Sequence, residues 1–510
     1  MAKKVDYGVI VIGAQSVYCS IINLKTLQEL ERVEYEVSIG DDVFARHEIQ
    51  IETVDTVIEA LTACQRLLKD YGLKPDRVVA TNAFHEAANA EYVRNQIYVR
   101  TGLEIEWINP SQEALYRNQA AAVYLPKFNE IVKDGTLLLD VSSGNVELTA
   151  YTGGQFIFSR NLKIGPLRIE EVMQDVKRLA PNYIEILRDY IDSQINEFKR
   201  MLPDSLKFDN IILMGSSISI FENAIPNKKM ATKVTGTRVK GLYEEILHAS
   251  DQYLIEHYHV SADKVPQVLP TVVMLNELLE LLKVKTVYLS QLKLIDGVAV
   301  NAAVQNGKKI GSWDSDAETI RSAVNLSNRY HVDPKHRDST VKFALTLFDR
   351  LKKIHGLGKK ERLLLHIAAL VNDVGSYVDN HNHYFHSDYI IRASKIVGLS
   401  STAQLMVAAI ARYHSTDTPS AELDRFDQLP IDKRMTIAKL TAILRLADAL
   451  DASRQQKITK ISVSVRDPQV IVTATAKENF ELEKWTFQRK GKFFEEVYGL
   501  QPILKGKGRL

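Results

Sequence analysis

The chain has 510 residues, of which 45% are hydrophobic and 25% are charged, and this composition indicates an ordinary globular protein rather than a disordered or fibrous one. Because a single hydrophobic core does not serve so long a chain, we expect three or more domains. The formal net charge of +2 argues against a general attraction to a nucleic-acid duplex or to a membrane.

The sequence also indicates a compartment. No hydrophobic signal region follows the first four residues, and the apolar stretches are far shorter than the roughly 20 residues of a membrane span. The two cysteines, Cys19 and Cys64, are more typical of buried small hydrophobic residues in a reducing environment than of a disulfide. We therefore expect a soluble cytoplasmic protein.

Strand and helix patterns alternate from residue 7 to about residue 126, and the pattern then restarts. Val17, Cys19 and Ile21, for example, recur with the period of two residues that is typical of a half-buried strand. The expected strands are 7–13, 16–23, 77–81, 136–141, 146–151, 156–161 and 210–214. The expected helices are 53–71, two that begin near 84 and 111, 167–178 and 184–201.

Two of these strands end in turns of small residues, which allow backbone N–H groups to approach a phosphate. In the second, Asp140 precedes a turn of serine, glycine and asparagine, and Glu147 follows it. An acid at this place is able to hold a divalent cation against the phosphate. The first turn, from Gly13 to Ser16, has Val11 where Asp140 stands in its counterpart, so only one half keeps the acid.

Two further segments join a strand to a helix. Polar and small residues in 80–89 open a helix, which suits an anion, although an ordinary helix cap is the commoner reason for them. Glu113 falls in the first turn of a helix after an apolar segment. A carboxylate there is able to orient and deprotonate a water, although a favourable charge at a helix N-terminus is again commoner.

From about residue 315 to 455 the pattern is nearly all helical, and eight of the 13 histidines lie between residues 331 and 414. The expected helices are 337–354, 360–371, 384–397, 400–413 and 433–450. In the remaining tail, strand periodicity appears at 461–465 and 470–475.

Taken in this order, the segments resemble the exopolyphosphatase / guanosine pentaphosphate phosphohydrolase (Ppx/GppA) family, which belongs to the sugar kinase–actin–Hsp70 superfamily. The family segments read I-D-I-G-S-N-S, A-T-x-A-x-R-x-A-x-N, S-G-x-E-E-A-R, D-I-G-G-G-S-T-E-L and S-L-P-L-G-x-x-R. Their counterparts here are residues 11–16, 80–89, 109–115, 140–148 and 160–168.

The resemblance covers essentially the whole chain and implies an α/β fold with four parts. Two actin-like, ribonuclease H-like domains are expected at 1–126 and 127–310, with the substrate cleft between them. An all-α HD-like domain is expected at 311–455 and a small α+β region at 456–510. The resemblance also implies a homodimer.

Carried over residue by residue, the resemblance makes Glu113 the catalytic base that activates water. Asp140 and Glu147 fall on acids that surround the metal, Mg²⁺ or Mn²⁺, and the terminal phosphate. The expected phosphate-binding residues are Gly13, Ser16, Asn82, His85, Gly144, Asn145 and Gly215.

This sequence departs from the family pattern at several of these positions. Val11 replaces an aspartate, which removes a carboxylate from the surroundings of the cation. His85 replaces an arginine and lacks its forked pair of donors. Ser142 and Ser143 replace two glycines, and the glycine-rich third loop is reduced to Gly215 followed by two serines.

The helical part resembles the framework of HD phosphohydrolases at His336, Asp373 and Asp448, and His386 and His414 stand where binuclear members place further histidines. Asn372 replaces the histidine of the HD pair, and a neutral amide is a poor ligand for a transition metal. We therefore expect no stoichiometric transition metal in this domain.

Three functions remain open. The first is an exopolyphosphatase-type hydrolase acting on polyphosphate or guanosine pentaphosphate, favoured by Glu113, Asp140 and Glu147. The second is a non-catalytic protein that binds polyphosphate or a nucleotide for regulation, favoured by Val11 and His85. The third is an HD-domain metal phosphohydrolase, which the asparagine of the HD pair disfavours.

Overall fold

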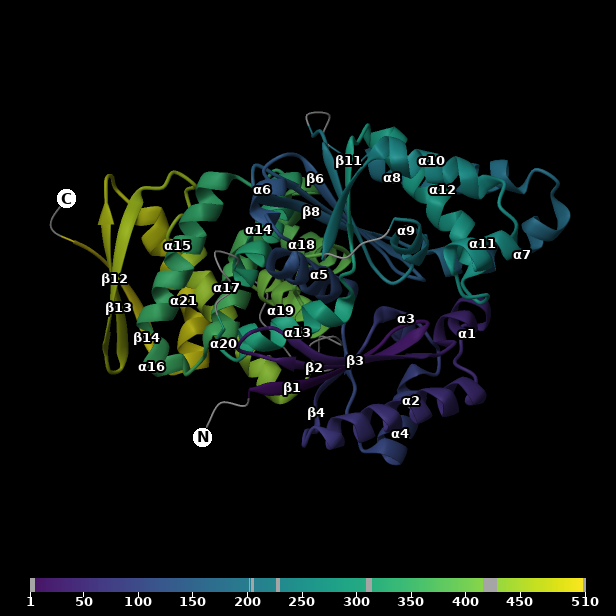
Figure 1. Ribbon diagram of the computed structural model, residues 1–510. Helices are drawn as coiled ribbons and strands as arrows, with labels where there is room; N and C mark the ends of the chain where they lie inside the picture. Colours follow the sequence, from purple (N-terminus) through teal and green to yellow (C-terminus); the bar gives the residue numbers. More distant parts are fainter. Residues whose placement is uncertain are drawn as a thin grey trace. The chain divides into compact units, whose positions relative to one another are not determined.

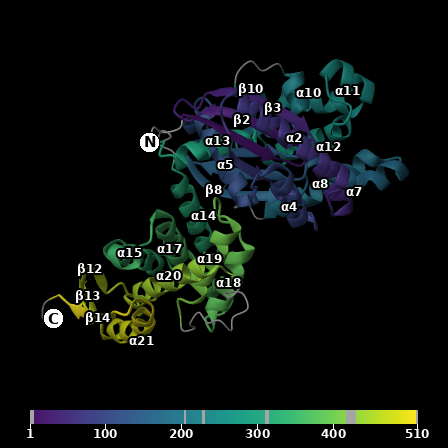
Figure 2. The same ribbon diagram turned by 90° about the horizontal axis from the view of Figure 1, so that it is seen from below.

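The computed structural model describes residues 5–200, 202, 206–225, 230–308, 314–415 and 429–507 (Figures 1 and 2). The chain divides into two compact units, residues 1–315 and 316–510. The first four residues, residue 201 at the end of one expected helix and the domain boundary expected at residue 310 lie outside the described residues.

The first unit begins with a five-stranded sheet in the order β3-β2-β1-β4-β5. Its strands are β1 (Asp6–Ile12), β2 (Ser16–Asn23), β3 (Glu29–Glu36), β4 (Pro75–Ala80) and β5 (Glu106–Trp107). The first three are antiparallel neighbours, and β4 and β5 continue the sheet in parallel. Because β1 and β2 lie at its centre, both are buried along most of their length.

Helices pack on this sheet around one hydrophobic core. They are α1 (Ile39–Arg46), α2 (Ile51–Asp70), the single turn α3 (Asn82–His85) and α4 (Ala90–Thr101). Figure 1 shows α2 and α4 together on one face of the sheet. The helix expected near residue 84 is thus two helices, with α4 beginning only at Ala90.

The second sheet repeats this arrangement. Its strands are β6 (Thr136–Val141), β7 (Val146–Thr152), β8 (Gln155–Leu162), β9 (Asn210–Met214), β10 (Ala231–Thr235) and β11 (Thr286–Ser290). The order β8-β7-β6-β9-β11 matches β3-β2-β1-β4-β5 in both sequence order and strand direction, and β10 is an additional edge strand. The expected duplication of an α/β unit is therefore confirmed.

Helices of the second sheet complete its core, which is separate from that of the first sheet. They are α7 (Pro166–Leu179), α8 (Tyr183–Arg200), α9 (Ser219–Ala224), α10 (Gly236–Leu247), α11 (Asp251–Tyr258) and α12 (Val265–Leu282). Among the described helices, α12 alone is long and apolar enough to cross a membrane, but 67% of it is buried inside the protein. It therefore has the character of a core helix.

Two helices join the halves of the first unit, α5 (Pro110–Tyr124) and α13 (Leu294–Gln305); the short α6 (Phe128–Ile131) follows α5. The two helices pack so closely that a Cβ on Gly297 of α13 would lie 2.0 Å from the carbonyl oxygen of Tyr116 on α5. After the second sheet, α13 returns to contact β1 and β2 of the first.

In the second unit, helices and a small sheet share one hydrophobic core. The helices are α14 (Ser315–Arg329), α15 (Pro334–Arg350), α16 (Lys352–His355), α17 (Lys359–Val371), the 3₁₀ turn η1 (Val374–Tyr377), α18 (His383–Ala393), α19 (Ser401–Arg412), α20 (Ile431–Ala449) and α21 (Glu481–Tyr498). The strands β12 (Ile458–Arg466), β13 (Gln469–Ala476) and β14 (Gln501–Gly506) form the sheet. Since α21 packs on both α20 and β14, the C-terminal tail shares its core with the helices.

Candidate active site

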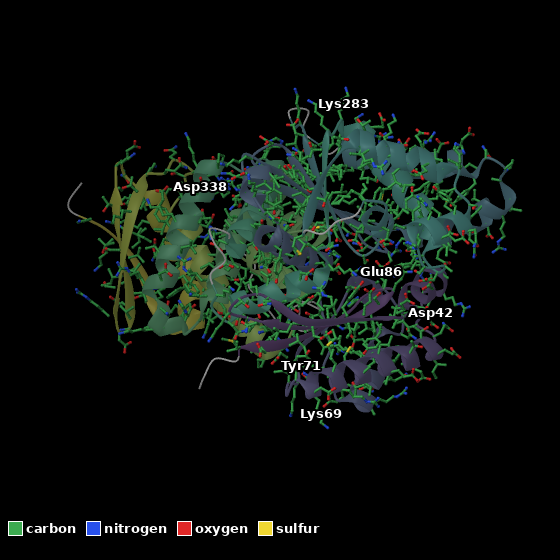
Figure 3. The ribbon with its side chains drawn as sticks, in the orientation of Figure 1. Asp42, Lys69, Tyr71, Glu86, Lys283 and Asp338 are labelled. Atoms are coloured by element: carbon green, nitrogen blue, oxygen red, sulfur yellow. The ribbon has the colours of Figure 1, made fainter. Side chains whose placement is uncertain are left out.

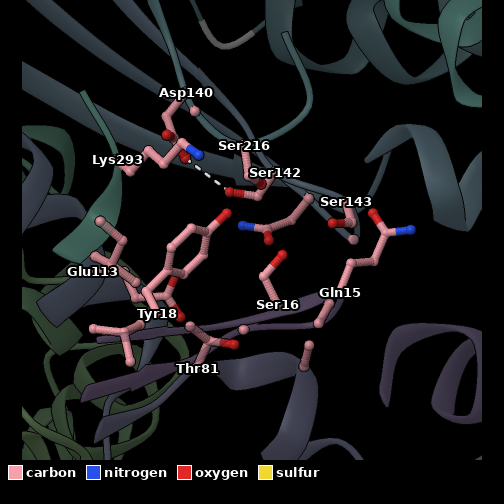
Figure 4. A pocket seen from close by; sticks show the side chains of 18 of the residues that line it. Gln15, Ser16, Tyr18, Thr81, Glu113, Asp140, Ser142, Ser143, Ser216 and Lys293 are labelled. Atoms are coloured by element: carbon pink, nitrogen blue, oxygen red, sulfur yellow. Dashed lines mark hydrogen bonds between the residues drawn. The ribbon is translucent and has the colours of Figure 1, made fainter. Parts of the chain in front are cut away.

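Two hairpin turns contribute to the wall of one cavity in the first unit (Figure 4). The first turn, residues 13–15, joins β1 to β2, and the second, residues 142–145, joins β6 to β7. Because the two sheets repeat one topology, the two turns are structural equivalents. In Figure 4 side chains from both halves, among them Ser16 and Ser142, point into the same space.

Hydrogen bonds hold the first turn in shape. The backbone N–H of Gly13 donates to the carbonyl oxygen of Ser16 at 2.8 Å. The Ser16 hydroxyl donates to Glu34 Oε1 at 2.7 Å, and Lys293 Nζ lies 3.0 Å from Glu34 Oε2. The lysine lowers the pKa of Glu34, although burial acts in the opposite direction with the largest single effect. This wall of the cavity therefore carries a fixed ion pair.

The second turn is fixed by close packing. A Cβ on Gly165 would come within 2.3 Å of both Ser143 O and Asn145 N, so the start of α7 requires glycine there. Leu167 N also donates to Ser143 O at 3.0 Å. A Cβ on Gly144 would meet the ring of Phe44 at 2.4 Å. Neither Gly144 in the turn nor Gly165 at the start of α7 thus has room for a larger residue.

The local sequence also explains where Glu113 lies. Asn109 and Gln112 form a reciprocal capping box, and Pro110 occupies the first position of α5, so the helix begins at a defined residue. Glu113 follows in the first turn with 3% of its surface exposed. Its Oε1 accepts a hydrogen bond of 3.1 Å from the backbone N–H of Asn82.

A buried arginine lies between the acids of the two halves. Arg117 Nη1 donates a hydrogen bond of 2.9 Å to Glu113 Oε2. Its Nε lies 2.5 Å from Asp140 Oδ2, and this second contact is an ion pair without the alignment of a hydrogen bond. The side chains of these three residues are only 4–5% exposed. Arg117 Nη2 also donates to Ser142 Oγ at 3.2 Å, and this hydroxyl donates to Asp140 Oδ2 at 3.1 Å (Figure 4).

Burial raises the pKa of Asp140 to about 6, because the loss of hydration outweighs the attraction of Arg117. The pKa of Arg117 is also raised, since the nearby carboxylates outweigh its own desolvation. The guanidinium therefore stays charged, while Asp140 titrates close to neutral pH.

These residues do not present a carboxylate set that fits a divalent cation. Both Glu113 oxygens are engaged, one by Asn82 and one by Arg117. Glu147 accepts hydrogen bonds from Ser159 Oγ at 2.5 Å and Asn161 Nδ2 at 2.9 Å. With Asp140 paired to the same arginine, a fixed positive charge already lies where the acids converge.

Most of the residues expected in the cleft line this cavity: Gly13, Ser16, Glu113, Asp140, Gly144, Asn145 and Gly215. Three expected residues lie outside the lining. The side chain of Asn82 bonds Glu86 at 2.9 Å, and the His85 ring packs edge-on against Trp107 at 5.4 Å between centroids. The third, Glu147, stays on β7, where it accepts hydrogen bonds from Ser159 and Asn161.

Sequence reasoning missed several residues that line the cavity, chiefly Arg117, Lys264 and Lys293. One of them had a signal, since Arg117 stands four residues after Glu113, the spacing at which a helix brings an acid and a base together. In the family segment the arginine falls two residues earlier, where this chain has Leu115. The two lysines belong to segments without a recognisable motif.

A clamp of charged residues spans the two halves beside the cavity. Glu86 of the first half pairs with Lys163 at 2.9 Å and with Arg168 at 2.6 Å, and Figure 3 labels its position. Arg168 also donates from Nε to the carbonyl oxygen of Gly144 at 2.9 Å and stacks over the Phe44 ring at 4.1 Å. The second turn is therefore tied directly to the first half.

The second unit brings together most of the residues expected in its histidine site. His336 Nε2 lies 3.2 Å from Asp448 Oδ1 and 3.7 Å from Asp373 Oδ2, and His414 Nε2 lies 3.5 Å from Asp373 Oδ1. The further histidine in contact with Asp373 is His383, at 3.4 Å. His386, expected in this role, is one turn further along α18.

Comparison with known proteins agrees with this architecture. Residues 19–305 match the Ppx/GppA phosphatase family, and residues 319–490 match Ppx/GppA phosphatase, domain III. An exopolyphosphatase from Cytophaga hutchinsonii is 15% identical, with a TM-score of 0.51, over 60% of this chain and 100% of that one. An exopolyphosphatase-like protein is 17% identical, with a TM-score of 0.51, over 59% and 98%.

A family member from Aquifex aeolicus is 19% identical, with a TM-score of 0.48, over 60% of this chain and 99% of that chain. The solved structures confirm the actin-like fold of the first unit. The family match extends over more than half of the sequence. The chain belongs to the Ppx/GppA phosphatase family.

Proposed function

We propose that this chain is an exopolyphosphatase-type hydrolase that releases terminal phosphate from inorganic polyphosphate or guanosine pentaphosphate in the cavity of the first unit. One observation carries the proposal. Glu113, the buried carboxylate in the first turn of α5, lines the same cavity as the two small-residue turns at 13–15 and 142–145. Membership in a phosphatase family supports the reaction class.

In this reaction, one group of residues binds the phosphate and Glu113 activates the water. The terminal phosphate lies against the turns at 13–15 and 142–145, and Arg117, Lys264 and Lys293 offset its negative charge. Because the substrate phosphate competes for Arg117, its binding draws the guanidinium away from Glu113. The freed carboxylate takes a proton from a water as the water oxygen bonds to phosphorus and the bridging P–O bond breaks. The leaving oxygen departs with the shortened chain.

A second candidate, a non-catalytic protein that binds polyphosphate or a nucleotide, is favoured by a specific observation. Arg117 is paired with both Glu113 and Asp140, and Val11 lines the cavity where the family has an acid. Such a site would hold a phosphate chain without activating water. The third candidate, an HD-domain hydrolase, depends on the second unit.

Phosphate release from polyphosphate and from guanosine pentaphosphate tests the proposal, with Mg²⁺, with Mn²⁺ and with chelator. Glu113→Gln should lower the rate by about 10²–10⁴-fold, because it removes a general base while keeping the shape of the side chain. Glu104→Gln is the matched control, since this exposed acid precedes the same helix and should leave the rate unchanged.

The outcomes separate the candidates. Wild-type protein that binds tripolyphosphate but releases no phosphate from either substrate would support the binding protein. Protein that neither binds nor hydrolyses would overturn both. A cytoplasmic location and a homodimer stay predictions, and sedimentation of the purified chain tests the dimer.

A further inference from the structure

Two histidines of the second unit are held so that one ring nitrogen of each faces the other. His414 Nδ1 lies 2.5 Å from the carbonyl oxygen of Ala411, and His383 Nδ1 lies 3.3 Å from that of Asn380. Because a carbonyl oxygen only accepts, each Nδ1 carries the hydrogen, and in the neutral ring each Nε2 then presents a lone pair. Metal-binding histidines in proteins are typically oriented through this kind of bond.

The two lone pairs meet a carboxylate oxygen in a nearly equilateral triangle. His383 Nε2 is 3.3 Å from His414 Nε2, and the two nitrogens are 3.4 Å and 3.5 Å from Asp373 Oδ1. Zinc–nitrogen bonds of about 2.0–2.1 Å at tetrahedral angles separate neighbouring ligand atoms by about 3.3–3.4 Å. The three atoms therefore have the spacing of one face of a tetrahedral site.

These separations are too long for strong hydrogen bonds between charged groups, which measure about 2.7–2.9 Å. Two lone pairs that face each other repel unless a proton or a cation lies between them. Asp373 and His414 are each only 2% exposed, so water does not relieve the repulsion freely. His383 is half-buried.

Further acidic and basic side chains border this group. His336 Nδ1 is 2.9 Å from Asp451 Oδ2, which directs its Nε2 towards Asp448 Oδ1 at 3.2 Å. Arg454 pairs with Asp373 Oδ2 at 2.8 Å. Lys490 likewise pairs with Asp448 Oδ2. Each acid thus has one oxygen bound by a basic side chain and the other directed towards histidine nitrogens.

We propose that His383, His414 and Asp373 bind one Zn²⁺ ion in the second unit, with His336 or Asp448 as the fourth ligand. His383 then supplies the nitrogen that Asn372 cannot. The backbone carbonyl oxygen of Asn372 accepts a 2.6 Å hydrogen bond from Ser387 Oγ, and its side-chain Nδ2 donates to Asp373 Oδ1 at 3.5 Å. This site belongs to the second unit, whereas the proposed hydrolytic cavity belongs to the first, and the proposal reverses the expectation drawn from Asn372.

Zinc titration of the full-length protein tests the proposal. The chain is purified without chelator for elemental analysis, then stripped with chelator and titrated with Zn²⁺ by calorimetry. We expect about one Zn²⁺ per chain and a higher unfolding temperature with the metal bound. Stripped protein loaded with Co²⁺ should show the visible absorption of tetrahedral coordination.

His386→Ala is the matched control for His383→Ala, because both residues stand on α18 one turn apart. His383→Ala should weaken zinc binding by tenfold or more, whereas His386→Ala should leave it unchanged. Should His383→Ala fail to fold, His414→Ala gives the same comparison, because His414 is also one of the three proposed ligands. Wild-type protein without stoichiometric zinc, or equal losses in the two histidine variants, would overturn the proposal. Neither result depends on phosphate release.

Discussion

Replacement of Arg117 by methionine tests whether its guanidinium provides the positive charge that the acids of the cavity require. At the observed distances of 2.9 and 2.5 Å, each ion pair attracts by about 6 kcal/mol at an effective dielectric constant of about 20. Desolvation of the three buried charges offsets most of this attraction. Breaking a buried pair by removing one partner typically costs about 3–5 kcal/mol, and we expect Arg117→Met to lose that much.

Urea-induced unfolding in chelator and in Mg²⁺ provides the assay. Arg117→Met leaves Glu113 and Asp140 without their shared counterion, so Mg²⁺ should restore part of the lost free energy of unfolding. Wild-type protein should gain much less from Mg²⁺. Arg117→Lys, which keeps the charge but loses the fork of donors, should fall between the two. A loss below about 1 kcal/mol, or equal effects of Mg²⁺ on wild type and variant, would refute the reasoning.

Two further predictions concern charge around the cavity. Protonation of Asp140 as the pH falls through about 6 removes one negative charge, so between pH 8 and pH 5 the affinity of wild-type protein for tripolyphosphate should rise about tenfold relative to that of Asp140→Asn by calorimetry, because both proteins share the titration of the ligand. An equal pH dependence in the two proteins would contradict the assignment. Glu86→Gln should lower the free energy of unfolding by about 1 kcal/mol, because the pairs with Lys163 and Arg168 are lost. Glu91→Gln, an exposed acid of α4, is its control and should change stability by less than about 0.5 kcal/mol.

The central strands could be predicted from sequence because their burial is visible in the residues themselves. The segment that forms β6 is apolar over most of its length, and that of β2 alternates. The edge strand β3 was not predicted, because it exposes one side and carries an acid at every second or third position. The sequence pattern predicts no element between residues 236 and 305, although this segment contains α10, α12, β11 and α13.

In the candidate site, too, the residues placed by local sequence could be predicted, whereas those placed by tertiary packing could not. Glu113 and the two turns could be predicted, because a helix start or a turn after a strand is a local property. The pairing of Arg117 with Asp140 depends on how α5 packs beside β6, which a single sequence does not specify. The choice between His383 and His386 depends on the rotation of α18, and one helical turn decides it.

The two halves of the first unit differ at equivalent positions of the same hairpin. In the second sheet, Asp140 on β6 faces Glu147 on β7. In the first sheet, Val11 on β1 faces Tyr18 on β2. A divalent cation shared between the halves would draw carboxylates from both hairpins, and in this pair of hairpins one supplies none.

The helix that joins the halves supplies a positive charge instead. Arg117 stands on α5, where its donors reach the acids of both halves in fixed directions. A guanidinium holds phosphate well, but it does not acidify a water as a metal ion does. Hydrolysis in this cavity must therefore rely on Glu113 to take the proton of the attacking water, whereas simple binding of a phosphate chain needs no such step. The rate of phosphate release by Glu113→Gln relative to wild type therefore distinguishes hydrolysis from binding alone.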